Sequence, residues 1–392
     1  MSKKLAAADR ATGSREWQLS RLLRPRPDWQ KTAQNLPFSE RRANWISHNV
    51  SSHCSPKAEC LRVRGVTVRA QLMDLKSSTS GPGVPHSLLG RFGGERPSAA
   101  EWFIAALAIE PERSTFAVEG SAIELLTWGK AGSPGLLFLH GNAAHADWWS
   151  FIAPLFANEF RCAAISWSGM GRSDWREHYA IPQFAQEALT AIEVADLGAS
   201  GEPPVIIAHS FGGFPTLYIC AEHPEAIAGA ILVDSAPPKP GGGPPPRLAQ
   251  GRAAHNRYPT LAAALQRFRF LPEQDSGHPE IIDYIARNGL HQVIESAESP
   301  GGWTWRFDPQ FWVRFDRQDH GQDLVRRSHA PLGIIHGELS ALLPHDLVEE
   351  TTAMVPDCRF VTAVARAHHH VMVDQPLALI EAIRAGLPKL RN

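Results

Sequence analysis

Residues 205–213 read Val-Ile-Ile-Ala-His-Ser-Phe-Gly-Gly. The apolar residues at the start predict a buried strand, and residues 214–222 predict a helix directly after it. Ser210 then lies on a sharp strand-to-helix turn, where the residues two positions away, Ala208 and Gly212, must be small to avoid clashes. Because such a turn exposes the hydroxyl beside the free N–H groups of a helix start, Ser210 is predicted to be a nucleophile.

Further apolar runs lie on both sides of this stretch. Residues 114–118 and 122–128 predict a hairpin, and residues 181–198 carry apolar side chains at helical spacing and predict a covering helix. Runs that are apolar at every position are typical of parallel strands buried on both faces. The chain has five mostly apolar runs of this kind, residues 135–139, 161–167, 204–208, 227–233 and 331–335, and a weaker sixth at 359–364. The pattern predicts an α/β protein with a mostly parallel sheet flanked by helices.

About a hundred residues separate the runs 227–233 and 331–335. The usual loop of such a sheet has about two to six residues. The gap opens with a Gly- and Pro-rich connection and continues with helical patterns over 261–270 and 280–288 and a cluster of Trp and Phe between 303 and 312. We therefore expect an inserted helical lid over about 237–328.

The formal net charge of the 392-residue chain is −1, which argues against a protein that coats nucleic acid. However, residues 1–98 carry 17 Lys and Arg against 7 Asp and Glu, whereas residues 99–392 carry 22 against 33. Residues 1–98 are rich in turn formers and lack a sustained period, so we expect a disordered basic tail before a folded domain of residues 99–392. A basic arm for nucleic acid or anionic lipid is the alternative, and a start codon placed too far upstream would give the same composition.

The remaining composition limits the class of protein. The five cysteines are widely spaced and form no CxxC or Cys/His pair, which argues against a disulfide framework and against a metal site. Apolar runs stay well short of the ~20 residues that span a bilayer, and the N-terminus lacks the apolar core of a secretory signal. We expect a cytoplasmic protein without a transmembrane segment, with no cofactor and no nucleic-acid partner, and with its oligomeric state left open.

Several motifs occur in the order found in one superfamily. His140-Gly141-Asn142 follows the run 135–139, residues 169–174 read Gly-Met-Gly-Arg-Ser-Asp, and Ser210 lies on the strand-to-helix turn. His369 precedes Asp374-Gln375-Pro376 at the spacing of the superfamily's base segment. Residues 99–392 therefore resemble the α/β-hydrolase fold, in its serine-dependent esterase and lipase-like branch. The resemblance implies His369 as the general base, although His368 stands where the family has a Gly.

The resemblance leaves the acidic member of the triad open. The family often places it three residues after a Gly that ends the seventh strand, and here that position holds Ser340. A serine does not stabilise an imidazolium as a carboxylate does. Asp234, which follows the run 227–233, is favoured as the acid over Glu338, which lies one residue past Gly337. A turn or cap residue is the competing interpretation of Asp234.

The rest of the predicted site is an oxyanion hole and an acyl pocket. The resemblance implies that the backbone N–H groups of Phe211 and Asn142 bind the oxyanion. Trp148 and Trp149 are predicted to bind an apolar substrate, with ordinary core packing as the alternative. The expected reaction is hydrolysis of a small apolar carboxylic ester, such as an acylglycerol, through an acyl-enzyme. C–C bond hydrolysis, lactone hydrolysis and a non-catalytic ligand-binding role remain as alternatives.

Overall fold

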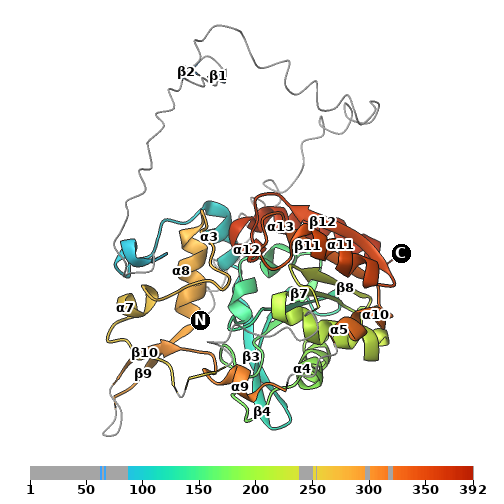
Figure 1. Cartoon of the computed structure of the whole chain (residues 1–392), viewed down its shortest axis with the longest axis horizontal. Helices are drawn as coiled ribbons and strands as arrows, with labels where there is room; N and C mark the ends of the chain where they lie inside the picture. The colour runs from blue at the N-terminus through green and yellow to red at the C-terminus, as the bar shows by residue number, and fades with distance from the viewer. Residues whose placement is uncertain are drawn as a thin grey trace, which may run out of the picture. The chain divides into compact units, whose positions relative to one another are not determined.

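The computed structural model describes residues 87–237, 250–252, 254–295, 301–316 and 321–391 (Figure 1). It also describes the backbone of the short antiparallel pair β1 (Arg62–Val63) and β2 (Val66–Thr67). The chain divides into two units, residues 1–85 and 86–392, and the predicted tail up to residue 86 otherwise lies outside the described residues. In the part described, no helix is both long and apolar enough to cross a membrane.

An eight-stranded sheet forms the centre of the larger unit, in the order β12-β11-β8-β7-β5-β6-β4-β3. β4 runs antiparallel to both its neighbours, and the pairs from β6 to β12 are parallel. The strands are β3 Glu112–Val118, β4 Ser121–Trp128, β5 Gly135–Leu139, β6 Arg161–Ile165, β7 Val205–His209, β8 Gly229–Val233, β11 Leu332–Gly337 and β12 Cys358–Val364. This is the α/β-hydrolase architecture that the sequence predicts.

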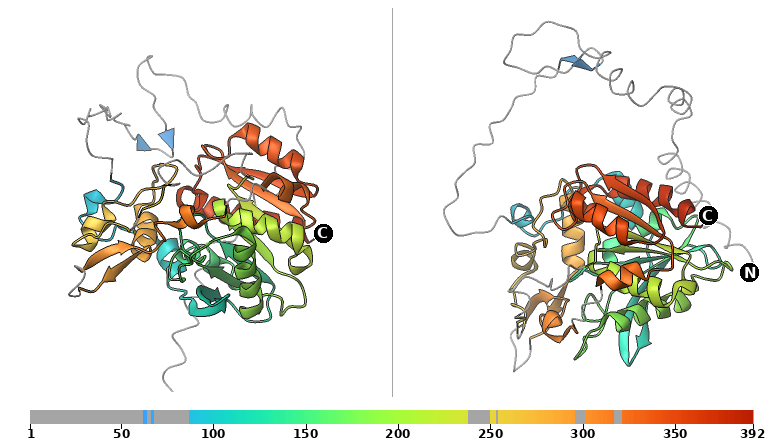
Figure 2. Two further views of the ribbon diagram at one scale, coloured as in Figure 1. Left: turned by 60° about the horizontal axis from the view of Figure 1, so that its bottom comes forward. Right: turned by 45° about the vertical axis from the view of Figure 1, so that its right-hand side comes forward.

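The burial of the strands explains why the apolar runs identify them. Every residue of β5, β7, β8 and β11 is buried, since helices cover both faces of the sheet (Figure 2). β3 lies at one edge of the sheet and most of its residues are exposed, so apolar and polar residues do not alternate regularly along it. A parallel strand that is covered on both faces needs apolar side chains on both faces. The central strands can therefore be recognised in the sequence as nearly continuous apolar runs.

The helices follow the strands at short intervals. α5 packs on β7, β8 and α4, while α13 packs on β8, β11 and β12. The helices outside the insertion are α3 Glu101–Leu107, α4 Ile181–Val194, α5 Gly213–Glu222, α11 His345–Met354, α12 Val371–Asp374 and α13 Pro376–Leu390. Single 3-10 turns are η2 Gly90–Phe92, η3 Ala146–Trp149, η4 Ala153–Leu155, η5 Ser210–Gly212 and η6 Pro224–Ala226.

The insertion between β8 and β11 is less helical than the sequence predicts. Its described elements are α7 Leu261–Leu265, α8 Pro279–Asn288, β9 Leu290–Val293, β10 Gly302–Trp305, α9 Phe311–Arg314 and α10 Gly321–Arg326. β9 and β10 form an antiparallel pair that lies beside α7 and α8 (Figure 1). Trp303 and Trp305, interpreted from sequence as part of a helical lid, lie on β10, where alternating Trp and Thr suit a half-buried strand.

Residues 87–98 belong to the folded unit, which corrects the tail boundary at residue 98. Leu89 is buried, and the Ser87 hydroxyl donates to the carbonyl of Gln266 beyond α7. The Arg287 guanidinium at the end of α8 donates to the Gly94 carbonyl at 2.6 Å. Composition alone hides this because a short irregular segment packs through one apolar side chain and its backbone, and leaves no periodic pattern.

Candidate active site

Ser210 lies directly after β7, on the turn predicted from the sequence. Its φ angle is +51°, in the left-handed region that residues other than glycine rarely occupy. A Cβ atom at Gly212 would come within 2.8 Å of the His140 carbonyl oxygen, and one at Gly213 would overlap Ser235. The Ser235 hydroxyl donates to the Ser210 carbonyl at 2.7 Å. Close packing on both sides therefore holds Ser210 in its strained conformation.

His369 lies on the loop between β12 and α12 and is buried. Its Nε2 is 2.9 Å from the Ser210 hydroxyl oxygen, and its Nδ1 is 2.6 Å from Oδ2 of Asp234. The carbonyl of His369 accepts a hydrogen bond from Nε2 of His209 at 3.0 Å. The residue before Ser210 in the chain thus holds the loop that carries His369.

Asp234 follows β8 and has a φ angle of +46°. Besides contacting His369, the carboxylate accepts a hydrogen bond from the Gly337 N–H at 2.8 Å and one from the Ser340 hydroxyl at 2.6 Å. The side chain of Asp234 is fully buried, so these donors replace water around a charged group. Ser340, which occupies the sequence position where the family often has its acid, lies beside the carboxylate and donates to it.

Glu338, the second candidate for the acid, lies elsewhere. Its side chain is exposed and its Oε2 accepts a hydrogen bond from the backbone N–H of Arg366 at 2.9 Å. Of the two carboxylates that the sequence left open, the structure brings Asp234 to His369. The Ser340–Asp234 contact joins residues 106 positions apart and has no signature in the sequence.

The turn after β5 lies against Ser210. A Cβ atom at Gly141 would be 3.1 Å from Cβ of Ser210, and Ala143 has a φ angle of +56°. Asn142 between them is half-buried. Phe211 begins the helical segment after Ser210, and its ring packs edge-on against Phe184 and Phe311. Asn142 and Phe211 are thus placed on either side of the serine.

His140 and His209 are buried and structural. Nε2 of His140 accepts from the Trp167 N–H at 3.1 Å, while the Trp167 indole donates to the His140 carbonyl at 3.0 Å. Burial lowers the pKa of His140 to about 3. Burial, and then the neighbouring His369, lowers the pKa of His209 well below its ordinary value. Both imidazoles are neutral at neutral pH. Both ring nitrogens of His140 are hydrogen-bonded, while Nδ1 of His209 has no partner among the described residues.

His368 and His370, which flank His369, connect the loop between β12 and α12 to other parts of the fold. Nδ1 and the backbone N–H of His368 contact Oδ2 of Asp374 at 2.9 and 2.8 Å. His370 donates from its backbone and from Nδ1 to Oε1 of Gln274, and the Gln274 amide donates to Asp374. Gln274 comes from the insertion, so this cross-link was absent from the sequence interpretation. Among the described residues no group of three or more His, Cys, Asp or Glu is placed to hold a metal ion.

The two predicted substrate-binding tryptophans separate in the structure. Trp148 packs against Phe270 of the insertion and against His370, with ring centroids 6.2 and 5.5 Å apart. Trp149 is fully buried and packs against Phe138 of β5 at 5.2 Å, within the core under the sheet. Consecutive residues on the tight 3-10 turn η3 point in different directions, so only Trp148 faces the insertion beside the His369 loop.

The sheet order and the strand-to-helix turn define an α/β-hydrolase fold, in which Ser210, His369 and Asp234 form one hydrogen-bonded chain. The sequence profile of the alpha/beta hydrolase family matches residues 136–382. The chain therefore belongs to the alpha/beta hydrolase family and is a hydrolase.

Individual relatives agree with this family. The esterase Rv0045c of Mycobacterium tuberculosis is 26% identical over 286 residues, which are 69% of this chain and 88% of that protein. A crystal structure of the same esterase aligns with a TM-score of 0.54 at 21% identity and covers 74% of this chain and 99% of that one. The crystal structure of E-2-(acetamidomethylene)succinate hydrolase aligns with a TM-score of 0.59 at 19% identity, over 71% of this chain and 100% of that one. At these identities the two structures support the fold alone.

Proposed function

We propose that the chain hydrolyses carboxylic esters through an acyl-enzyme, with Ser210 as the nucleophile, His369 as the base and Asp234 as the acid. The observation that carries the proposal is the continuous hydrogen-bond chain from the Ser210 hydroxyl through His369 to the Asp234 carboxylate. The similarity to an esterase over most of the chain supports an ester as substrate.

In the first half-reaction, the Ser210 oxygen attacks the ester carbonyl carbon while Nε2 of His369 takes its proton. The tetrahedral intermediate collapses when the C–O bond to the alcohol breaks, and His369 returns the proton to the departing alkoxide oxygen. In the second half-reaction a water loses a proton to His369 and attacks the acyl carbon. The Ser210 oxygen then leaves and recovers its proton, so that one ester and one water become one acid and one alcohol.

Asp234 supports these steps by holding one tautomer of His369. Its Oδ2 accepts from Nδ1, which leaves the Nε2 lone pair free to take the Ser210 proton. When His369 becomes charged, the carboxylate stabilises the imidazolium. The donors Gly337 N–H and the Ser340 hydroxyl keep the carboxylate oriented in a buried place.

The oxyanion of the intermediate is stabilised by the backbone N–H groups of Phe211 and Asn142. A Cβ atom built on Gly141 would be 3.1 Å from Cβ of Ser210, and this close approach of the turn supports the arrangement. Loss of one such donor typically costs about 3 kcal/mol of transition-state stabilisation. Trp148 and Phe270 then provide an apolar wall for the substrate beside the His369 loop.

A fluorophosphonate probe tests the nucleophile directly, because it phosphonylates an activated serine. We expect one label per chain, located on Ser210 by peptide mass spectrometry, and parallel loss of 4-nitrophenyl butyrate turnover. Ser210→Ala should abolish both, while Ser200→Ala, a change at a serine in the loop before β7, should retain both. Labelling that persists in Ser210→Ala would overturn the proposal.

A further inference from the structure

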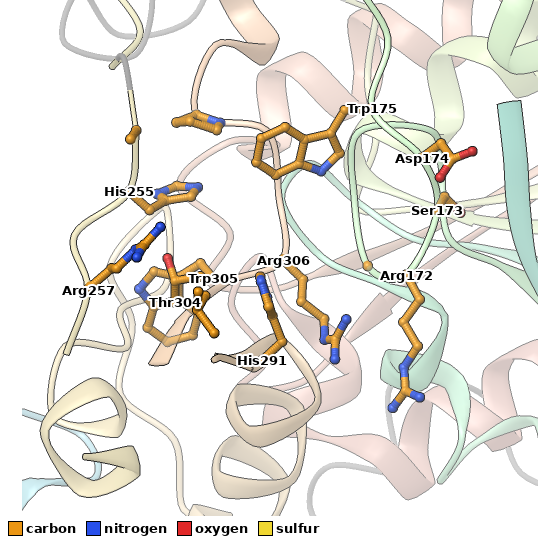
Figure 3. Close-up of a pocket in the computed structure, with 14 residues that line it drawn as sticks. Arg172, Ser173, Asp174, Trp175, His255, Arg257, His291, Thr304, Trp305 and Arg306 are labelled. Atoms are coloured by element: carbon orange, nitrogen blue, oxygen red, sulfur yellow. The ribbon is translucent and has the colours of Figure 1, made fainter. Parts of the chain in front are cut away.

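A cavity of about 510 Å³ lies between the loop after β6 and the insertion. The loop contributes Gly171 to Trp175, and the insertion contributes residues of 254–257 and of the β9–β10 hairpin (Figure 3). Its size is within the range of small-molecule sites, about 300–1,000 Å³. The catalytic chain proposed above uses none of the residues that line it.

The lining carries a strong excess of positive charge. Arg172, Arg257 and Arg306 line the cavity, and the one acidic residue of the lining is Asp174. The Asp174 carboxylate accepts a hydrogen bond from the backbone of Ala122 at 2.8 Å, and in Figure 3 it points away from Arg306. Arg172 lies 3.5 Å from buried Glu124, which partly compensates its charge.

Arg306 is held by the backbone of the insertion. Its Nε donates to the Leu290 carbonyl at 3.0 Å, and within the described ranges it makes no ion pair with a carboxylate. Burial lowers the pKa of Arg306, Arg172 lowers it further, and Glu124 and Asp147 oppose the shift. A negatively charged group in the cavity would relieve this repulsion.

Two histidines, His255 and His291, line the same cavity. Nδ1 of His291 is buried and has no hydrogen-bond partner among the residues that the structure describes. Nε2 of His255 donates to the Phe307 carbonyl at 2.6 Å, which fixes that ring in place. Burial lowers the pKa of both histidines, and the neighbouring arginines contribute to each shift.

The cavity lies on the same edge of the sheet as Ser210. β6 and β7 are parallel and are separated by β5 alone, so their carboxyl ends are about 10 Å apart at ~4.8 Å per strand. A Cβ atom at Gly171 would lie 2.9 Å from Cβ of His145, which follows the turn of Asn142. The loop that lines the cavity is thus packed against the turn proposed to bind the oxyanion.

From these observations we propose that this cavity binds an anionic oxygen group of the substrate, a carboxylate or a phosphate, at the end of the substrate remote from the ester. The inference rests on the proposed esterase function and specifies its substrate class. Arg306, Arg257 and Arg172 supply the charge. An ester with an anion at the end of its chain remote from the carbonyl contacts Ser210 and the cavity together.

Three 4-nitrophenyl esters of equal chain length test this specificity, with a terminal carboxylate, a terminal phosphate or a neutral terminal methyl ester. We expect the anionic esters to have a KM at least about tenfold below that of the neutral ester, since a hydrogen-bonded charge contributes roughly tenfold or more. Arg306→Met should reduce this preference about tenfold, and Arg306→Lys should restore part of it. Arg327→Met removes one positive charge directly after α10, outside the cavity, and should leave the preference as it is.

A binding measurement separates this proposal from the catalytic one. Inorganic phosphate and glutarate should each raise the Tm of Ser210→Ala, and the additional change Arg257→Met or Arg306→Met should remove the shift. Absence of any shift, or equal effects of Arg306→Met on anionic and neutral esters, would overturn the anion site while leaving the esterase proposal standing. Failure of Ser210 labelling would instead overturn the catalytic proposal, and the binding result would still decide the site.

Discussion

The carboxyl edge of the sheet and the insertion differ in how they hold their functional side chains. Ser210 and Asp234 directly follow the fully buried strands β7 and β8 and have positive φ angles, while His369 lies on the loop after the partly exposed edge strand β12. The insertion consists of short helices and the half-buried strand β10, with charged residues around a cavity. A rigid edge suits atoms that must react within a few tenths of an ångström, whereas short elements suit a surface that selects substrates.

The sheet edge and the insertion contact each other at the loop that carries His369. Gln274 of the insertion bonds to His370 and Asp374 on either side of α12, and Trp148 packs against Phe270. The insertion therefore contacts the loop that carries His369 and has no hydrogen bond to Ser210 or Asp234 among the described residues. Changes at the sheet edge should affect the chemistry itself, and changes in the insertion should produce smaller effects.

The largest expected effect comes from removing the charge of Asp234. Asp234→Asn keeps the size of the side chain but favours the wrong tautomer of His369, and we expect kcat on 4-nitrophenyl butyrate to fall about 10⁴-fold. Steady-state kinetics at neutral pH provide the measurement. Glu338→Gln is the matched control and should change kcat less than about threefold, since Glu338 bonds to the Arg366 backbone. The reverse ranking would make Glu338 the acid.

Removing the segment before α3 should affect stability through the insertion. Deletion of residues 1–94 removes Leu89, which is 2% exposed, and the carbonyl that Arg287 binds. We expect the free energy of unfolding to fall by about 2 kcal/mol, the value of one buried Leu side chain. Deletion of residues 1–86 should leave both stability and turnover close to those of the full chain. Equal urea midpoints for the two truncated chains would contradict the packing of residues 87–94.

Breaking the cross-link between the regions should have a moderate effect. Gln274→Leu removes three hydrogen bonds to His370 and Asp374 and loosens the loop of His369, so we expect kcat/KM to fall about tenfold. Gln292→Leu, at an exposed position of β9 in the same insertion, is the control and should behave like the parent protein. If both variants keep full activity, the insertion does not position the base.

The smallest expected effect is a pH dependence of the free energy of unfolding that arises from His140, directly after β5. The pKa of His140 is about 3 in the folded protein, below its ordinary value near 6.5, so the unfolded chain takes up a proton first as the pH falls. The stabilisation that neutral His140 contributes is fully present above about pH 6.5 and is lost as the pH falls from about 6.5 to about 3. Between pH 7.5 and pH 5.5 the free energy of unfolding, measured with urea, should fall by about 1 kcal/mol less in His140→Gln than in the parent protein. An identical loss in both would mean that His140 titrates in the folded state as it does in the unfolded chain.

Much of the fold could be predicted because the central strands are apolar on both faces. The runs 135–139 and 227–233 overlap β5 and β8, and the helix predicted after Ser210 corresponds to α5. The strand pair β9–β10 was missed because two four-residue strands are too short for a period to emerge. Trp149 was interpreted as a substrate contact because the sequence does not tell which of two adjacent aromatic residues faces the core.

The sequence by itself determined the fold class, the placement of Ser210 on a strained turn and the spacing of His369, because each depends on residues close together in the chain. Only the tertiary structure decided which carboxylate meets His369, since Asp234 and His369 are 135 positions apart and Ser340 joins them from a third segment. Likewise, Arg172, Arg257 and Arg306 come from separate segments and surround one cavity. Local patterns reflect backbone conformation and burial, whereas a site is set by the order in which strands pair, and that order is fixed by packing across the whole sheet.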